Sequence, residues 1–249
     1  MDERYIRSVS LENISGDNSY LRKLPVVKNL ASVGELDFND KVTFFVGENG
    51  TGKSTLLEAI AVNFGFNAEG GTLNFSFSTF DSHSTLYRYI KLVKCFKRPR
   101  DGFFLRAESF YNAASYIQEL DDIIAPSPKI SVSYGGRSLH EQSHGESFFA
   151  LITNRFSGNG IYILDEPEAA LSPMRQMSLL AEIHKLVNNG SQFIIATHSP
   201  ILLAYPNASI YELTADEIRL TSYEQTETYR VTKGFLDDPK RMISYLFEE

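Results

Sequence analysis

One stretch of the chain has residue types and spacing that suit phosphate chemistry, Gly47-Glu48-Asn49-Gly50-Thr51-Gly52-Lys53-Ser54. It fits the pattern G-x-x-x-x-G-K-[ST], in which glycines let the backbone wrap closely so that N–H groups face an anion. A helix that begins at the end of such a loop adds its positive dipole end. We therefore expect a nucleoside triphosphate to bind here. The residues expected to contact it are Gly47, Asn49, Gly50, Thr51, Gly52, Lys53, Ser54 and Thr55.

The two residues that end this loop have separate expected roles. Lys53 would bridge the β- and γ-phosphates, and the Ser54 hydroxyl would ligate Mg²⁺. The alternative is an ordinary glycine turn with a surface lysine. The flanking sequence argues against it, because residues 42–46 form an apolar run typical of a buried strand and the apolar residues of 54–64 fall on one helical face. Strand, glycine-rich turn and helix are the context that the motif requires.

A second candidate for chemistry is the apolar run from Gly160, which ends in Asp165, Glu166, Pro167 and Glu168. It predicts a central parallel strand, and ligands of open α/β sheets bind at the carboxyl ends of such strands. Asp165 would hold Mg²⁺, and Glu166 would orient or deprotonate the attacking water. The alternative is a strand that ends in a solvated acidic turn, which the nearby phosphate loop disfavours.

Two further segments complete the candidate site. Residues 192–196 predict another buried strand, which leads into Thr197-His198-Ser199-Pro200. A lone histidine is more often structural, but at this strand end His198 is well placed to contact a γ-phosphate. Ser143-His144-Gly145-Glu146-Ser147 opens a predicted helix whose N-terminus can receive an anion. Because the phosphate loop already holds a nucleotide, Ser143, Gly145 and Glu146 would serve a nucleotide held by a neighbouring subunit.

Composition sets limits on the partners. The formal net charge of −7 over 249 residues argues against electrostatic coating of nucleic acid or of an anionic membrane. One basic cluster runs from Lys91 to Arg100, and a solvated strand end explains it better than a phosphate-backbone contact. No apolar run approaches the roughly 18 residues that a membrane span needs. The start of the chain is not built like a signal peptide, and the single Cys95, expected to be buried, forms no internal disulfide. A cytoplasmic protein is the simplest expectation.

The pattern of strands and helices predicts one α/β domain over residues 1–249. We expect a mostly parallel core sheet flanked by helices, an antiparallel β lobe, and a small helical lobe inserted at about 106–142. An edge strand is expected at 5–12. Further strands are expected at 30–38, 73–80, 86–96 and 102–105, and helices at 109–124 and after Ser172.

Taken in order, these motifs resemble those of the ATP-binding-cassette (ABC) ATPases. Residues 47–54 look like the Walker A motif, and residues 165–166 look like Walker B. Residues 143–147 resemble the signature, residues 170–172 resemble the D-loop, and His198 resembles the switch histidine. The chain is similar to the soluble SMC/RecF-like branch and most similar to small standalone bacterial AAA-type ATPases. The resemblance implies a P-loop NTPase fold and Mg²⁺-dependent ATP hydrolysis that drives dimerisation. It also implies ATP sandwiched between two head-to-tail protomers, with the signature acting in trans.

The chain departs from the family pattern at several points. Ser-His-Gly-Glu replaces the transporter-type Leu-Ser-Gly-Gly-Gln, which argues against a transporter subunit. Glu108 lies closest to the position of the missing Q-loop glutamine and is expected to contact the metal or its water. Ser172 takes the position of the D-loop aspartate, and the insertion is too short for a long coiled coil.

Three hypotheses about the function remain open. The leading one is an ATPase in a nucleic-acid transaction or in defence, with DNA or RNA as partner. The second is a slow ATP-dependent switch that regulates an effector protein. The third is a zinc protease, because His140-Glu141-Gln142-Ser143-His144 matches H-E-x-x-H. Glycines precede this segment closely, and Ser143 and Gly145 indicate a helix start, so the continuous helix that zinc chemistry needs is not expected.

Overall fold

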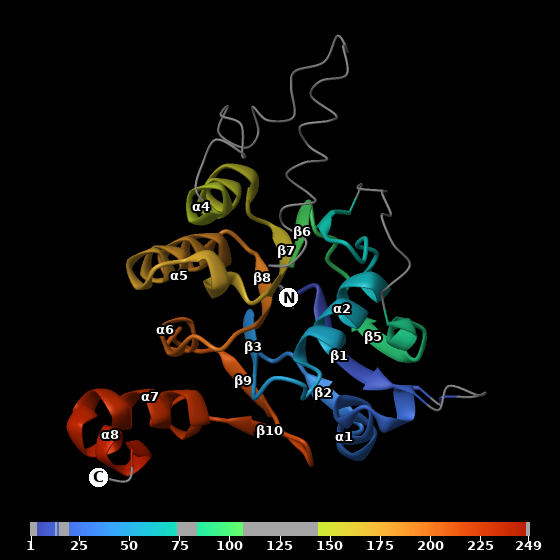
Figure 1. Cartoon of the computed structure of the whole chain (residues 1–249). Helices are drawn as coiled ribbons and strands as arrows, with labels where there is room; N and C mark the ends of the chain where they lie inside the picture. Colours follow the sequence, from blue (N-terminus) through green and yellow to red (C-terminus); the bar gives the residue numbers. More distant parts are fainter. Residues whose placement is uncertain (1–3, 13, 15–19, 74–83, 107–143, 248–249) are drawn as a thin grey trace.

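The computed structural model describes residues 4–12, 14, 20–73, 84–106 and 144–247 (Figure 1). Its main sheet has seven strands in the order β10-β9-β3-β8-β7-β6-β4. The five inner strands run parallel, whereas β10 and β4 pair antiparallel at the two edges. The strand bounds are β3 Val42–Val46, β4 Gly71–Thr72, β6 Asp101–Arg106, β7 Gly160–Asp165, β8 Gln192–Ala196, β9 Ser209–Leu213 and β10 Ile218–Thr221.

The inner strands are apolar throughout because both faces of the sheet are covered. Every residue of β3, β7 and β8 is buried. Successive side chains of a strand point to opposite faces, so Phe45 joins a core with Leu56 and Ile60 of α2, while Phe44 joins a core with Leu179 and Ile183 of α5. Figure 1 shows α1 and α2 on one side of this sheet and α4, α5 and α6 on the other. The helix bounds are α1 Pro25–Val33, α2 Lys53–Phe64, α4 His144–Arg155, α5 Pro173–Asn188, α6 Pro200–Leu203, α7 Glu227–Asp237 and α8 Pro239–Phe247.

The expected antiparallel lobe is present as a three-stranded sheet in the order β2-β1-β5. The strands are β1 (Ile6–Leu11), β2 (Glu35–Asp37) and β5 (Ile90–Lys94). The prediction that the first strand lies at an edge is wrong, because β1 pairs with β2 on one side and with β5 on the other. Both partners come from later in the chain, so local patterning gives no sign of them.

Two predicted strands are shorter than expected, because helical turns take their first residues. The segment 30–38 begins inside α1, which starts with Pro25 at its first turn and ends at Gly34 with φ of 81°. Only β2 remains of that strand. The segment 86–96 begins with the 3-10 helix η2 (Thr85–Arg88), which the Ser84 side chain caps, and only β5 remains extended. Proline at a helix start and glycine at its end are ordinary helix boundaries, and they outweigh the β-branched pattern here.

The remaining sequence predictions for this part of the chain have mixed outcomes. The strands around residues 42–46, 102–105, 160–165 and 192–196 are confirmed, and Ser172 caps α5 by accepting from the Arg175 N–H. The expected strand at 73–80 and the helix at 109–124 lie almost wholly outside the described residues, as does the lobe at 106–142. Cys95 was expected to be buried, but it is only half-buried.

The basic cluster after β5 makes contacts within the fold. The Lys94 ammonium lies 3.3 Å from the carbonyl oxygens of Asn63 and Phe64, at the C-terminus of α2, where a cation is favourable. The Lys97 ammonium lies over the Tyr5 ring and 3.4 Å from the carbonyl oxygen of Gly190. These contacts support the interpretation of the cluster as a strand end and not as a nucleic-acid binding surface.

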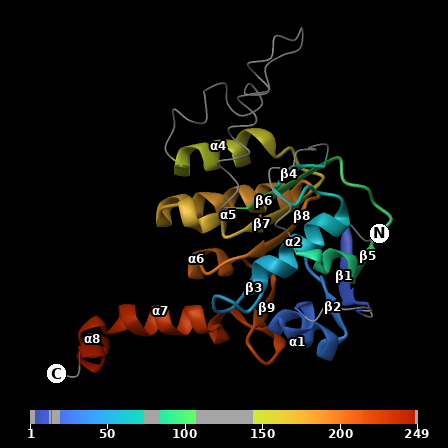
Figure 2. The same cartoon turned by 45° about the vertical axis from the view of Figure 1, so that its right-hand side comes forward.

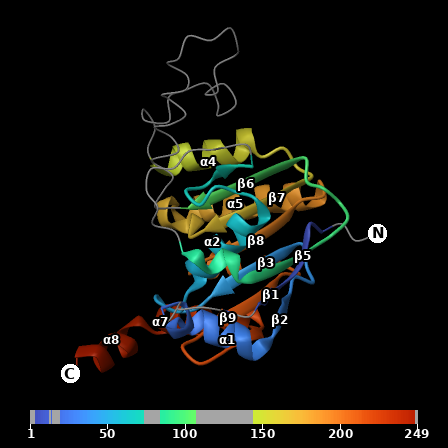
Figure 3. The same cartoon turned by 90° about the vertical axis from the view of Figure 1, so that its right-hand side faces the viewer.

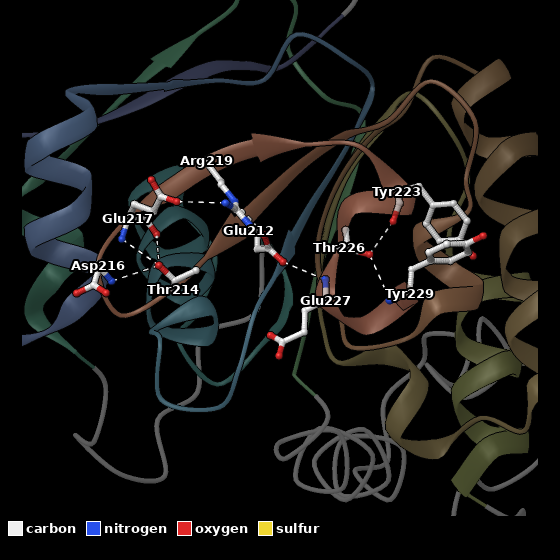
Figure 4. A network of polar contacts seen from close by, with 9 residues as sticks. All are labelled: Glu212, Thr214, Asp216, Glu217, Arg219, Tyr223, Thr226, Glu227 and Tyr229. Carbon is white, nitrogen blue, oxygen red and sulfur yellow. Dashed lines mark hydrogen bonds and ion pairs between the residues drawn. The ribbon is translucent and has the colours of Figure 1, made fainter. Parts of the chain in front are cut away.

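Beyond the main sheet, the chain ends in two amphipathic helices that extend away from the body (Figures 2 and 3). Neither α7 nor α8 has a buried residue. Their attachment runs through Glu212 of β9, whose carboxylate accepts from Arg219 at 2.6 Å and from the Glu227 N–H at 3.2 Å (Figure 4). None of the helices within the described ranges is long and apolar enough to cross a membrane.

A buried carboxylate holds the approach to β7 in place. Asp101 accepts hydrogen bonds from the Tyr162 hydroxyl at 2.8 Å, the Ser157 N–H at 3.0 Å and the Arg155 guanidinium at 2.8 Å. Burial by itself raises the pKa of Asp101, but the hydrogen bonds from Ser157 and Tyr162 and the charge of Arg155 more than offset it, so the pKa is lowered overall. The folded protein therefore favours the ionised carboxylate.

This network gives a prediction about stability and pH. Because the folded pKa of Asp101 lies below the unfolded one, its stabilising contribution is present above the unfolded pKa, about 3.9, and is lost as the pH falls further. We expect Asp101→Asn to lower the free energy of unfolding by about 2 kcal/mol at pH 7. The loss should shrink as the pH falls below about 4, because the carboxylate of the unfolded wild-type chain then takes up a proton while the folded one still resists it. Urea unfolding at several pH values measures both effects, with the exposed Asp216→Asn as control. An Asp101→Asn deficit that stays constant down to pH 2 would contradict the assignment.

Candidate active site

The glycine-rich loop follows β3 and leads directly into α2, as predicted. Gly47, Gly50 and Gly52 have φ values of 147°, 86° and 97°, in the region that favours glycine. Space also requires glycine at two of these positions. A Cβ atom at Gly47 would lie 2.0 Å from the carbonyl oxygen of Leu213, and one at Gly52 would lie 2.5 Å from the Val26 side chain. The loop is therefore a tightly wrapped turn, as its motif predicts.

Lys53 is the first residue of α2, and its side chain folds back across the loop. The ammonium donates hydrogen bonds to the carbonyl oxygens of Gly47 at 2.8 Å and of Glu48 at 3.0 Å. Burial lowers the pKa of Lys53, while the carboxylates of Glu166, Asp165 and Glu168 act in the opposite direction. Lys53 thus lies between the loop backbone and the acids at the end of β7.

Two oxygen ligands predicted from distant parts of the sequence meet beside this lysine. The Ser54 hydroxyl donates to Asp165 Oδ1 at 3.0 Å. Ser54 lies in the first turn of α2, and Asp165 ends β7, where it is largely buried. A hydroxyl and a carboxylate oxygen at this spacing suit a hard divalent cation such as Mg²⁺, which prefers oxygen ligands.

The next acid faces the predicted switch histidine. His198 Nε2 lies 3.5 Å from Glu166 Oε1, and both side chains are more than one-third exposed. Glu166 has φ of 48°, which is uncommon for a residue other than glycine, and its N–H donates to the carbonyl oxygen of Ala196 at 2.9 Å. This backbone bond ties the end of β7 to the end of β8. The strained turn aims the Glu166 side chain out of the sheet and toward His198.

The sequence assigns no role to a third acid in the same run, Glu168. It lies in the 3-10 helix η5 (Pro167–Ala170), and its Oε1 accepts the His198 N–H at 2.5 Å. The side-chain pattern of residues 165–168 gave one signal for it, namely a carboxylate two residues after Glu166. That signal does not distinguish a solvated acid from one that holds a neighbouring loop.

The predicted signature segment is described only in part. Gly145 and Glu146 lie in the first turn of α4, which contacts α5 and η5 on the same face of the sheet. Ser143, Glu108 and most of the H-E-x-x-H segment, including His140 and Glu141, lie outside the described residues. The described residues hold no group of three or more His, Cys, Asp or Glu side chains arranged for a metal ion.

A pocket of about 330 Å³ opens beside the phosphate loop. Loop residues 47–51 form one wall, and Leu213, Thr214 and Ala215 form another, with Glu212 and Glu227 at the far side. Figure 4 shows Glu212 between Arg219 and the start of α7, so the carboxylate already accepts hydrogen bonds from two residues. The pocket gives a bound molecule room next to the loop.

Two protein-family models match the chain. One, described as an AAA domain, matches residues 26–132, which include the phosphate loop. The other, described as an AAA ATPase domain, matches residues 144–203, which include Asp165, Glu166 and His198. The two matches therefore cover both halves of the site described above.

Curated and solved proteins extend the comparison. The galactose/methyl galactoside import ATP-binding protein MglA of Escherichia coli K12 is 28% identical over 210 residues, which is 76% of this chain and 38% of that protein. The same protein of Shigella flexneri matches equally. The chain thus spans well under half the length of these relatives. A nucleotide-free ATP-binding cassette of an ABC transporter has a TM-score of 0.48 at 17% identity, with 95% of this chain and 96% of that one covered. A dimeric bacterial ABC transporter cassette has a TM-score of 0.41 at 16% identity, with 77% of this chain and 90% of that one covered.

Three findings point to the same family. The AAA-domain models cover the phosphate loop and the later acids, the parallel sheet places these motifs at adjoining strand ends, and Ser54 meets Asp165 there. The chain is a P-loop ATPase that matches AAA-domain models on both sides of its site.

Proposed function

We propose that this ATPase uses Mg²⁺ and works as a head-to-tail dimer. In that dimer, each nucleotide-binding site is completed by residues of the second copy. The observation that carries the proposal is the convergence of Ser54, Asp165, Glu166 and His198 at the ends of neighbouring elements. Each of these side chains has the chemistry that one step of phosphoryl transfer to water requires.

Within one copy, the roles follow from the contacts. Lys53 and the loop backbone would bind the β- and γ-phosphates, while Ser54 and Asp165 would hold Mg²⁺. The bound ion supplies charge neutralisation at the phosphate oxygens. Glu166 would accept a proton from the attacking water, and its exposed carboxylate is reachable by that water. His198, on the far side of Glu166, would donate a hydrogen bond to the γ-phosphate.

The second half of the site is proposed to come from α4 of a neighbouring copy. Ser143 and Gly145 at the start of that helix would place backbone N–H groups and a positive helix end on the γ-phosphate. Glu146 would lie in the same turn. The support for this arrangement is the family resemblance of the segment and the position of α4 on the face of the sheet opposite α2.

A complementation experiment tests the composite site. Lys53→Ala should inactivate a copy's own loop, and Ser143→Arg should block the γ-phosphate of its neighbour. Each variant alone is then expected to be inactive. In an equimolar mixture, half the dimers combine the two and keep one intact site of two, so about a quarter of wild-type ATPase activity should return. The rate of phosphate release measures the recovered ATPase activity, and a mixture of two Lys53→Ala preparations is the control. Recovery no greater than the sum of the separate variants would contradict action in trans.

We propose that ATP hydrolysis is coupled to a nucleic-acid transaction or to a defence role. The motifs resemble those of the SMC/RecF-like branch. A slow switch that regulates an effector protein is the alternative from the sequence. ATPase rates with and without DNA or RNA separate the two, because stimulation by nucleic acid favours the first. A stably co-purifying effector, with turnover indifferent to nucleic acid, favours the second.

One finding favours another candidate function. The 28% identity to a sugar-import ATP-binding protein over 210 residues suggests a partner embedded in a membrane. Ser-His-Gly-Glu in place of the transporter signature argues the other way. Co-purification with a membrane permease would support import.

Stoichiometric zinc that is lost in His140→Ala would instead support the zinc-protease hypothesis.

A further inference from the structure

Glu168 links the turn after β7 to the turn after β8. Its Oε1 accepts a hydrogen bond from the backbone N–H of His198 at 2.5 Å. Pro167 at the start of η5 restricts the backbone just before Glu168. The acceptor is therefore presented from a stiff turn that directly follows Glu166.

A second contact joins the same two segments a few residues further on. The Ser199 hydroxyl donates to Gln176 Oε1 at 2.6 Å, and Gln176 Nε2 donates to the carbonyl oxygen of Leu171 at 3.0 Å. Ser199 also caps α6 by accepting from the Ile201 and Leu202 N–H groups. The backbone around His198 is thus held at two points by the segment that runs from η5 into α5.

The imidazole of His198 has few contacts of its own. Its one polar neighbour among the described residues is Glu166, at 3.5 Å, and no described residue gives the buried Nε2 a hydrogen bond. Since the ring itself is not anchored, its direction depends on the backbone from which it projects. That backbone is the one that Glu168 holds.

We propose that Glu168 is a positioning residue for the ATPase reaction, because it fixes the backbone of His198 so that the imidazole faces Glu166 and the γ-phosphate. The proposal rests on the role of His198 in the proposed function. Glu168 acts through a single accepted hydrogen bond, which a glutamine carbonyl can replace. Its negative charge is not required for that bond.

The first test compares three variants with the wild type by steady-state kinetics. Glu168→Ala should lower kcat by about 10- to 100-fold, because a catalytic group displaced by about 1 Å costs up to that much. The KM for ATP and the affinity for a fluorescent ATP analogue should stay within about twofold, since the Glu168 side chain hydrogen-bonds the His198 N–H and acts on Lys53 only as the last of three carboxylates. Glu168→Gln should recover most of the rate. Gln176→Ala, which removes the second contact, should give a smaller loss of kcat in the same direction.

A double-mutant cycle with His198→Ala separates positioning from a general structural effect. If Glu168 acts through His198, Glu168→Ala should cause no further loss of kcat in the His198→Ala background. The same fold-loss in both backgrounds would overturn the proposal. Thermal melting of each variant verifies folding, and Glu182→Ala, at a surface ion pair with Lys185 on α5, is the matched control. Should Glu168→Ala fail to fold, the cycle is run with Glu168→Met, which also removes the hydrogen-bond acceptor but fills the space, and an equal loss of kcat in both backgrounds again overturns the proposal.

The outcomes also distinguish this proposal from the proposed function. If Lys53→Ala and Glu166→Gln abolish activity while Glu168→Ala matches wild type, the positioning role is overturned and the proposed function stands. If His198→Ala hydrolyses ATP at the wild-type rate, both the role of His198 and its positioning by Glu168 are overturned.

Discussion

Replacing Lys53 with alanine is expected to weaken ATP binding by at least about 100-fold, because it removes a cation that would make charge-assisted hydrogen bonds to two phosphates. The ammonium already lies at the mouth of the loop, where it donates to the carbonyl oxygens of Gly47 and Glu48. Bound phosphates would take over these donors. Isothermal titration with ATP in the presence of Mg²⁺ measures the loss of affinity.

Two controls sharpen this first prediction. Lys185→Ala removes a solvent-exposed lysine that pairs with Glu182 on α5, and it should bind ATP like wild type. Lys53→Arg keeps the charge but changes its shape, so it should recover only part of the affinity, since the loop leaves little space around a planar group. An affinity of Lys53→Ala within threefold of wild type would refute the phosphate-binding role of the loop.

Replacing Glu166 with glutamine is expected to lower the rate of ATP hydrolysis by about 10²- to 10⁴-fold while ATP still binds, because the amide cannot accept the proton of the attacking water. Unhydrolysed ATP should then hold two copies together, so a dimer should accumulate. Phosphate release gives the rate, and light scattering after size-exclusion chromatography gives the mass with and without ATP.

The geometry explains why these two results should differ. Lys53 contacts the loop that would enclose the phosphates, whereas Glu166 lies on the other side of Asp165 and faces His198. Loss of the first side chain removes binding, and loss of the second removes chemistry. Wild-type hydrolysis by Glu166→Gln would show that another group takes the proton. If Glu166→Gln loses hydrolysis as expected but forms no ATP-dependent dimer, that result would contradict the proposed head-to-tail assembly.

Several features of the site could be predicted from local sequence. The spacing of Gly47, Gly50 and Gly52 requires a tight backbone turn, and an apolar run before it and an amphipathic run after it leave little choice of context. The run that ends in Asp165 and Glu166 is apolar throughout, which is typical of a strand buried on both faces. In each case a property of fewer than about fifteen neighbouring residues decides the structure.

The errors have a common physical origin. The first strand was expected at an edge, but its neighbours are β2 and β5, which lie later in the chain. The residues from Leu30 onward have the pattern of a strand, but α1, bounded by Pro25 and Gly34, continues through Val33. Pairing between distant strands and competition between helix and strand depend on tertiary contacts, which outweigh local propensity.

The sequence by itself determined which side chains are candidates for the chemistry, because the phosphate loop, the paired acids and the histidine after a buried strand each have a local signature. Only the tertiary structure decided how they meet. The hydroxyl of Ser54 reaches Asp165 because β3 and β7 flank β8 in a parallel sheet, which brings their carboxyl ends to one edge. Likewise Glu168 finds the His198 N–H through a contact between residues 30 positions apart, and no pattern along the chain encodes a hydrogen bond of that kind.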